Sequence, residues 1–140
     1  MELGMIQLMK MKQSVERILH VPGNYKGHLS RTCHSLEDIK ANKKGHEYLF
    51  FNPVFDEHSK QSYMGDYTPL ELRKAHKAGI IDKKVIALGG IDIDNIRQVK
   101  DYGFGGAAIM GALWNRFDTC CDCDYSLIID HFKKLKKLAD

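Results

Sequence analysis

The stretch Lys84-Val85-Ile86-Ala87-Leu88-Gly89-Gly90-Ile91 predicts a buried strand that ends in a glycine pair, because its apolar run is short and bounded by turn residues. A helical pattern follows over residues 92–102, and Gly103 is its predicted end. A second apolar run at 107–111 also ends in glycine. Two strands that each end in glycine before a helix predict a phosphate cradle, since glycine lets the backbone approach an anion and a helix N-terminus offers free N–H groups.

Length and composition favour one globular domain. The chain has 140 residues, enough for a real core, and its 44% of hydrophobic residues argues against disorder. The formal net charge of +3 is too small to indicate nucleic-acid binding. No run approaches the roughly 18 apolar residues of a membrane span, and Glu2, Gln7, Lys10 and Lys12 interrupt any signal-peptide core. We therefore expect a cytoplasmic protein with neither a nucleic-acid nor a membrane partner.

Three of the four cysteines, Cys120, Cys121 and Cys123, crowd into one short stretch. Only Cys120 and Cys123 have the C-x-x-C spacing of half a zinc site, and the sequence has no second pair. We predict reduced surface thiols in a loop, with adventitious metal binding as the alternative, and we assign no metal site.

Predicted strands alternate with predicted helices, which implies an α/β fold with a parallel sheet and crossover helices. The strands are predicted at 27–32, 47–51, 84–90 and 105–110, with a further candidate at 3–8. A complete (β/α)8 barrel needs at least about 200 residues, so 140 residues predict either part of a TIM barrel or a small open sheet. Barrel phosphate sites often use the last two strands and a short extra helix, and this detail favours the partial barrel.

The helix boundaries are predicted from capping residues. One helix is predicted from an N-cap at Ser35 to Lys44. Another is predicted from Thr68, where Glu71 completes a capping box, to near Gly79. A helical turn is predicted at 112–116 and a last helix at 125–139. The apolar positions of the last helix that we expect to be buried are Ile128, Phe132 and Leu135.

Four segments carry a resemblance to a known family. They are Thr32-Cys33-His34-Ser35, Asn52-Pro53-Val54-Phe55 with Ser59-Lys60 beyond it, the ALGGI run at 87–91 and the GAAIMGA run at 106–112. In this order and spacing the chain resembles the C-terminal part of the thiamine phosphate synthase/TenI family, from near Tyr25 to the C-terminus, whereas residues 1–24 match poorly. The resemblance implies a single domain over 1–140 that corresponds to the last four or five βα units of the barrel.

The resemblance implies a transferase of thiamine biosynthesis that joins a hydroxymethylpyrimidine diphosphate to a thiazole phosphate. Pyrophosphate would leave first, and the thiazole nitrogen would capture the resulting pyrimidine cation. Lys60 would meet the leaving diphosphate as a mobile charge, with the hydroxyl groups of Ser59 and Thr32 beside it. The backbone N–H groups that would hold the thiazole phosphate are those of Gly90, Met110 and Gly111, with Gly89 in the same site.

Two positions depart from the family pattern. Glu57 stands where many members carry a second hydroxyl residue, and its carboxylate would repel a phosphate unless it turned away or met a metal. Gly111 stands where many members carry serine, so a side-chain donor is lost and the backbone donor is kept. The resemblance also implies Mg²⁺, but the family's Mg²⁺-binding aspartates belong to the half that has no match here, so we assign no metal ligand.

Other functions stay open. The related thiazole tautomerase uses a histidine as its acid–base group, and His34 occupies the matching place. A structural histidine at a strand end is the alternative for the same residue. The chain could also be a non-catalytic phosphate-binding remnant. A barrel cut to its last strands leaves open sheet edges, so we expect a homodimer or a partner chain that covers them.

Overall fold

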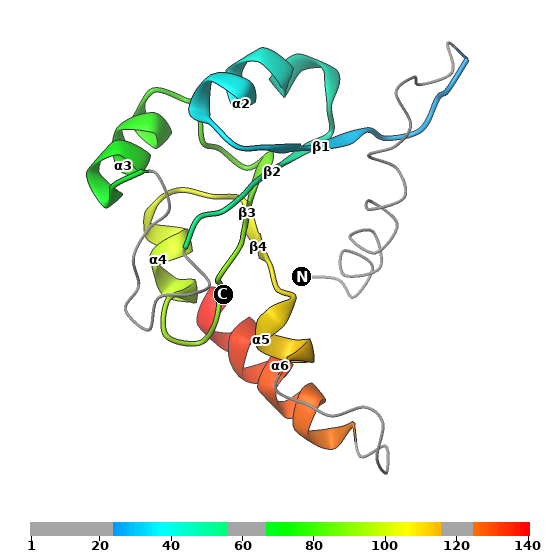
Figure 1. Ribbon diagram of the computed structural model, residues 1–140, viewed down its shortest axis with the longest axis vertical. Coiled ribbons are helices and arrows are strands. Elements are labelled where there is room, and N and C mark those ends of the chain that lie inside the picture. The colour runs from blue at the N-terminus through cyan, green and yellow to red at the C-terminus, as the bar shows by residue number, and fades with distance from the viewer. Residues whose placement is uncertain (1–23, 56–66, 116–124) are drawn as a thin grey trace.

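The computed structural model describes residues 24–55, 67–115 and 125–140. Within these ranges the chain forms one sheet with the strand order β1-β2-β3-β4, and every neighbouring pair is parallel (Figure 1). The strands are β1 (Ser30–Cys33), β2 (Tyr48–Phe51), β3 (Val85–Leu88) and β4 (Gly106–Ala108). The predicted α/β class with a parallel sheet is therefore confirmed, whereas the candidate strand at 3–8 lies outside the described residues.

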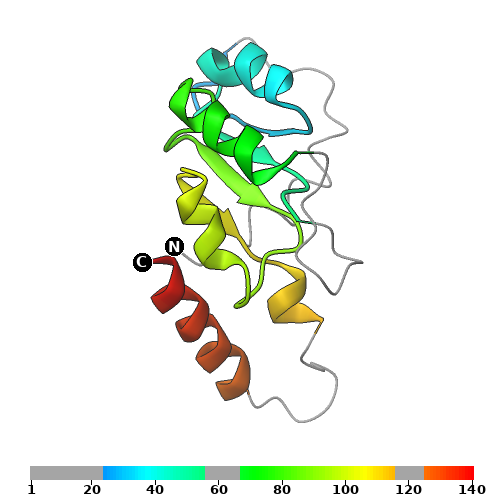
Figure 2. The ribbon, with the colours of Figure 1, turned by 90° about the vertical axis from the view of Figure 1, so that its left-hand side faces the viewer.

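The helices lie together on one face of this sheet. Figure 2 shows α2, α3, α4 and α6 stacked in chain order from top to bottom. The strands lie in the sheet in the same order as in the chain. Right-handed crossovers between strands in this order place all connecting helices on the same face. None of the helices that the structure describes is long and apolar enough to cross a membrane. The helical segments are α2 (Leu36–Asn42), the 3-10 turn η1 (Lys43–Gly45), α3 (Pro69–Lys77), α4 (Ile96–Asp101), α5 (Gly111–Trp114) and α6 (Ser126–Ala139).

The predicted helix caps are confirmed. The Ser35 hydroxyl accepts a hydrogen bond from the Asp38 N–H at 3.1 Å and begins α2. Thr68 and Glu71 form the complete capping box of α3, and the hydrogen bonds from Thr68 hold the pKa of the Glu71 carboxyl below its usual value. Gly79 and Gly103 follow α3 and α4 with φ angles of 75° and 82°, the left-handed conformation that ends a helix.

Three local predictions are wrong in detail. The helix predicted from residue 92 begins at Ile96, because the Asn95 side chain bonds the preceding loop. The α-helix predicted to reach Lys44 ends at Asn42, and Gly45 closes a 3-10 turn instead. In α6 only Leu135 is buried as predicted. Ile128 and Phe132 are half-buried, since they pack at the margin of the core.

The sheet separates two apolar clusters, because successive side chains of a strand point to opposite faces. Leu49, Phe51, Val85 and Ala87 belong to the larger cluster, which also includes buried residues of α2, α3, α4 and α6. The smaller cluster lies on the opposite face and comprises Phe50, Ile86, Leu88 and Ala108. The strand register pairs Phe50 with Ile86 and Leu88 with Ala108, so the smaller cluster runs across three neighbouring strands.

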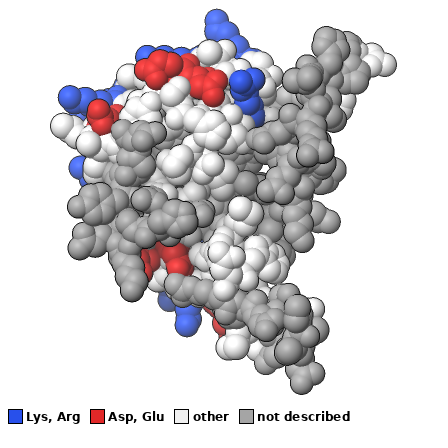
Figure 3. All heavy atoms as spheres, viewed as in Figure 1, with Lys and Arg blue, Asp and Glu red and all other residues white. Residues whose placement is uncertain are grey.

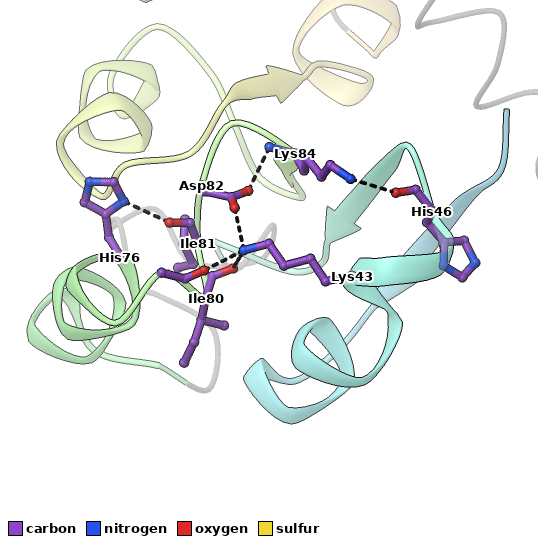
Figure 4. Close-up of polar contacts among 8 residues, drawn as sticks. Lys43, His46, His76, Ile80, Ile81, Asp82 and Lys84 are labelled. Atoms are coloured by element: carbon purple, nitrogen blue, oxygen red, sulfur yellow. Dashed lines mark hydrogen bonds and ion pairs between the residues drawn. The ribbon is translucent and has the colours of Figure 1, made fainter.

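Charged side chains tie the loops together at the amino edge of the sheet (Figure 4). The Lys43 ammonium lies 2.5 Å from the Asp82 carboxylate and donates to the Ile80 carbonyl at 3.1 Å. Asp82 also accepts from the Lys84 N–H at 2.9 Å. Burial by itself would raise the pKa of Asp82, but the hydrogen bonds from Lys43 and Lys84 outweigh it and hold the pKa below its ordinary value. The segment before β2 is therefore fastened to the segment before β3.

Candidate functional site

The carboxyl ends of the four strands meet at one edge of the sheet, because all of the strands run in the same direction. Ligands of parallel α/β sheets bind at this edge, where loops and not strands face the solvent. Six of the predicted site residues lie within or directly after strands at this edge. They are Thr32 and His34 at β1, Gly89 and Gly90 after β3, and Met110 and Gly111 after β4.

The end of β3 is packed tightly against the segment that follows β2. The Val54 N–H donates to the Leu88 carbonyl at 3.0 Å, and the Phe55 N–H donates to the Gly89 carbonyl at 3.3 Å. A Cβ atom on Gly89 would lie 2.6 Å from the Asn52 side-chain oxygen, and one on Gly90 would lie 2.7 Å from the Phe55 carbonyl oxygen. Both glycines have positive φ angles, 98° and 61°. The glycine pair is therefore required by its conformation and by the close approach of a second backbone.

The end of β4 is more open. β4 pairs with β3 through Leu88 and Ala108, so the segment after Ala108 lies beside the glycine pair. Met110 is 50% exposed and is the N-cap residue of α5. A Cβ atom on Gly111 would meet only the side chain of Asn115, at 3.0 Å. This end of the sheet thus tolerates a larger residue, whereas the end of β3 does not.

The two strand ends present unbonded backbone donors. In the part of the chain that the structure describes, the N–H groups of Gly90, Met110 and Gly111 donate to no protein acceptor. Figure 3 shows Lys, Arg, Asp and Glu of the described residues mainly along the margins of the face in view. Neighbouring N–H groups at the end of parallel strands can bind an anionic oxygen without a charged side chain.

His34 lies directly after β1, and it is exposed. Its Nδ1 is 2.7 Å from the Asn52 carbonyl oxygen. A carbonyl only accepts, so Nδ1 carries the proton in this contact and Nε2 of the neutral ring is left as the proton acceptor. Thr32 precedes it by two residues in β1 and is half-buried. The histidine is thus oriented by the end of β2 and faces solvent at the same edge as the glycines.

The remaining predicted residues cannot be placed in this edge. Ser59, Lys60 and Glu57 lie outside the described residues, as do Cys120, Cys121 and Cys123. Cys33 lies at the end of β1 and is buried. In the ranges 24–55, 67–115 and 125–140, no three His, Cys, Asp or Glu side chains come together as a metal site.

Asn95 lies beside the glycine pair, and the sequence pattern did not indicate its role in this loop. It is 7% exposed, and its side chain bonds the loop that leads away from Gly90. The signal was present as an asparagine directly before a helix, at a position where N-cap residues are preferred. The apolar residues at 91 and 93 hid it, because they extended the helical pattern backward to residue 92.

Comparison with known proteins identifies the family of this chain. The thiamine monophosphate synthase family model matches residues 12–113. The thiamine-phosphate synthase of Actinobacillus succinogenes is 32% identical over 102 residues, which cover 71% of this chain and 45% of that protein. The chain thus spans less than half the length of this curated relative.

Solved structures agree with the sequence relatives. The thiamine phosphate pyrophosphorylase of Bacteroides thetaiotaomicron is similar with a TM-score of 0.74 and 51% identity, covering 86% of this chain and 57% of that one. The thiamine phosphate pyrophosphorylase of Pyrococcus furiosus gives a TM-score of 0.51 and 26% identity, covering 79% of this chain and 50% of that one. The suspected family is confirmed, and the chain belongs to the thiamine monophosphate synthase family.

Proposed function

We propose that this chain is the phosphate-binding, C-terminal part of a thiamine phosphate synthase. Residues 1–140 would form one domain equivalent to the last βα units of a TIM barrel. The strand order without reversal supports this, because it puts all helices on one face as in a barrel wall. The observation that carries the proposal is the set of unbonded N–H groups at Gly90, Met110 and Gly111, on adjacent strand ends in a chain of this family.

The proposed ligand of these N–H groups is the phosphate of a thiazole phosphate. Gly89 and Gly90 let the backbone come close to the phosphate oxygens, and Met110 and Gly111 approach them from the neighbouring strand. The held thiazole would present its ring nitrogen to the pyrimidine cation that forms when pyrophosphate leaves. Fixing the nucleophile in this way lowers the barrier by orientation and not by acid–base chemistry.

The second substrate, the hydroxymethylpyrimidine diphosphate, is assigned to residues nearer β1 and β2. We assign Lys60 to the charge of the leaving diphosphate and Ser59 and Thr32 to hydrogen bonds with it. Among the described residues no three His, Cys, Asp or Glu side chains come together, and this proposal routes no step through a metal.

An assembly would complete the site. β1 and β4 are edge strands of the described sheet, and exposed edges of parallel strands invite pairing with another chain. We propose that a second copy or a partner chain covers them. Sedimentation velocity of the purified chain tests this, and a stable monomer with well-protected edge amides would count against it.

Titration of the ¹⁵N-labelled chain with thiazole phosphate tests the cradle. The amide signals of Gly90, Met110 and Gly111 should shift with saturation, while that of Gly45 at the amino edge should not. Uniform or absent shifts at the strand ends would remove the proposed site. When both substrates are added, we expect the chain alone to bind thiazole phosphate without condensing the two.

The alternative is a thiazole tautomerase, and the geometry of His34 favours it as a second candidate. The Asn52 carbonyl orients the ring and leaves Nε2 available as a base at the edge that holds the proposed cradle. His34→Ala should then lower tautomerisation about 100-fold or more, whereas His28→Ala, at an exposed histidine before β1, should not change it. Unchanged tautomerisation by His34→Ala would eliminate this candidate. Phosphate binding without either activity would leave a non-catalytic remnant.

A further inference from the structure

Among the described residues Asn95 is the buried polar residue, and the proposed chemistry gives it no role. Its Nδ2 donates to the Gly90 carbonyl at 2.8 Å, and its Oδ1 accepts from the Asp92 N–H at 2.9 Å. A buried amide that uses both its donor and its acceptor in this way fixes the loop at two points. The loop between Gly90 and α4 is therefore closed by one side chain.

Asp92 extends this connection to the last helix. Its Oδ1 accepts from the Ile93 N–H at 2.7 Å and lies 3.3 Å from Nε2 of His131 in α6. The side chain of His131 is 10% exposed and that of Asp92 is 23% exposed, so solvent screens the contact weakly. Figures 1 and 2 show α6 beside α4, the helix that follows the loop after Gly90. Contacts thus run from α6 through Asp92 and Asn95 to Gly90.

These contacts bear on the direction of one N–H group. The Gly89 carbonyl accepts from the Phe55 N–H, which holds the peptide unit between Gly89 and Gly90 on one side. In a trans peptide the N–H points opposite to the carbonyl, so the Gly90 N–H points away from Phe55. The following peptide unit is held by Asn95 through the Gly90 carbonyl. Without that second bond, glycine could rotate between its two signs of φ.

We propose that Asn95, Asp92 and His131 are positioning residues of the phosphate cradle, through which the last helix sets the orientation of the Gly90 peptide. The proposal rests on the proposed function for its ligand, inorganic phosphate or the phosphate of a thiazole. None of the three residues touches the phosphate. They keep the Gly90 N–H aimed at the position where a phosphate oxygen would lie.

Two measurements on the full chain test this proposal. Hydrogen exchange of the Phe55 amide reports loosening at Gly89, and an NMR titration with inorganic phosphate reports the Kd of the cradle. Asn95→Ala removes both bonds, and Asn95→Asp keeps the acceptor for Asp92 but replaces the donor to Gly90 with a carboxylate oxygen that repels the carbonyl. Both variants should speed Phe55 exchange and weaken phosphate binding about tenfold, the effect of about one hydrogen bond.

Matched variants separate positioning from general destabilisation. Asn42 is the control, since its Nδ2 also donates to a backbone carbonyl at 2.8 Å, that of Asp38, away from the carboxyl edge. Asn42→Ala should leave both readouts unchanged. Asp92→Ala and His131→Leu should resemble Asn95→Ala, whereas Asp92→Asn keeps an acceptor oxygen and should restore most of the phosphate affinity. The Leu49 amide, which donates to the Lys84 carbonyl at the amino edge, reports global opening.

The outcomes are distinct. Faster exchange at Phe55 with unchanged exchange at Leu49 supports the positioning role. Unchanged exchange at Phe55, or an equal increase at Phe55 and Leu49, would overturn it. A phosphate Kd within twofold of wild type in Asn95→Ala would overturn it as well. If the wild-type chain binds no phosphate, the proposed function fails, and Phe55 exchange still decides whether Asn95 orients the turn.

Discussion

The two edges of the sheet are held by different means. At the amino edge, Lys43 reaches across to Asp82 and to backbone carbonyls, so long side chains join segments that remain apart. At the carboxyl edge, the backbone after β2 packs directly on Gly89 and Gly90, with no room for a side chain between them. The comparison teaches that polar side chains join the segments at the amino edge and can be replaced at small cost, whereas the backbone packing at the carboxyl edge, where the proposed site lies, requires glycine.

Gly90→Ala should have the largest effect, because it combines a left-handed φ with a Cβ atom 2.7 Å from the Phe55 carbonyl. We expect a loss of about 3 kcal/mol in the free energy of unfolding, measured by urea denaturation. Gly79→Ala is the matched control, since Gly79 also has a positive φ but open space around its Cβ position. It should cost about 1 kcal/mol. Equal losses would mean that backbone packing at Gly90 is unimportant.

Lys43→Met should have a smaller effect, because its partner Asp82 keeps a side chain that is 42% exposed and can be hydrated. We expect a loss of about 1 kcal/mol in the same denaturation experiment. The neighbouring Lys44 is exposed, and Lys44→Met should change stability by less than about 0.5 kcal/mol. If the two variants had the same free energy of unfolding, the contacts of Lys43 at the amino edge would not contribute to stability.

Acid should release the tie at Asp82. Its folded pKa lies below the ordinary value of 3.8, so the carboxylate binds protons more readily in the unfolded chain. The stabilisation is therefore present above pH 3.8 and is lost as the pH falls through the lower folded pKa. The difference in stability between wild type and Asp82→Asn should shrink over that range. A difference that stayed constant down to the acid limit would contradict this assignment.

Gly111→Ala should have the smallest effect. Its φ is not left-handed, and its Cβ would meet only the movable side chain of Asn115. We expect a change of less than about 0.5 kcal/mol in stability and an unchanged affinity for phosphate, since the N–H group is kept. A loss comparable to that of Gly90→Ala would show that the two strand ends are equally constrained, and it would erase the difference between them.

The parts of the fold that were predicted correctly depend on neighbours in the sequence. Ser35 and Thr68 cap helices because each side chain reaches an N–H three residues away. Gly79 and Gly103 end helices because glycine adopts the left-handed conformation at little energetic cost. The strand ends that carry the predicted site residues were identified by apolar runs followed by glycine. Such signals depend on residues that are only a few positions apart, so they can be recognised in the sequence.

The missed features connect residues that are distant in sequence. Lys43 and Asp82 meet only because β2 and β3 pair in one register. Phe50 lies on the opposite face from Leu49 and Phe51 because side chains alternate along a strand, but all three are apolar, so only the packing of the helices on one face decides which of them join the larger cluster. The candidate site was predicted in part. Its glycines were recognised because they follow apolar runs, whereas Asn95 was not recognised because it lies within an apolar pattern.

The sequence by itself determined the α/β order, the caps and the position of the glycine-terminated strands, because these rest on local spacing and conformational preference. Tertiary structure alone decided why Gly89 and Gly90 must be glycine, since the backbone that excludes a Cβ atom comes from residues 52–55. It also decided that Asp92 and Asn95 join His131 to this turn, because that contact spans 39 residues and requires α6 to pack beside α4.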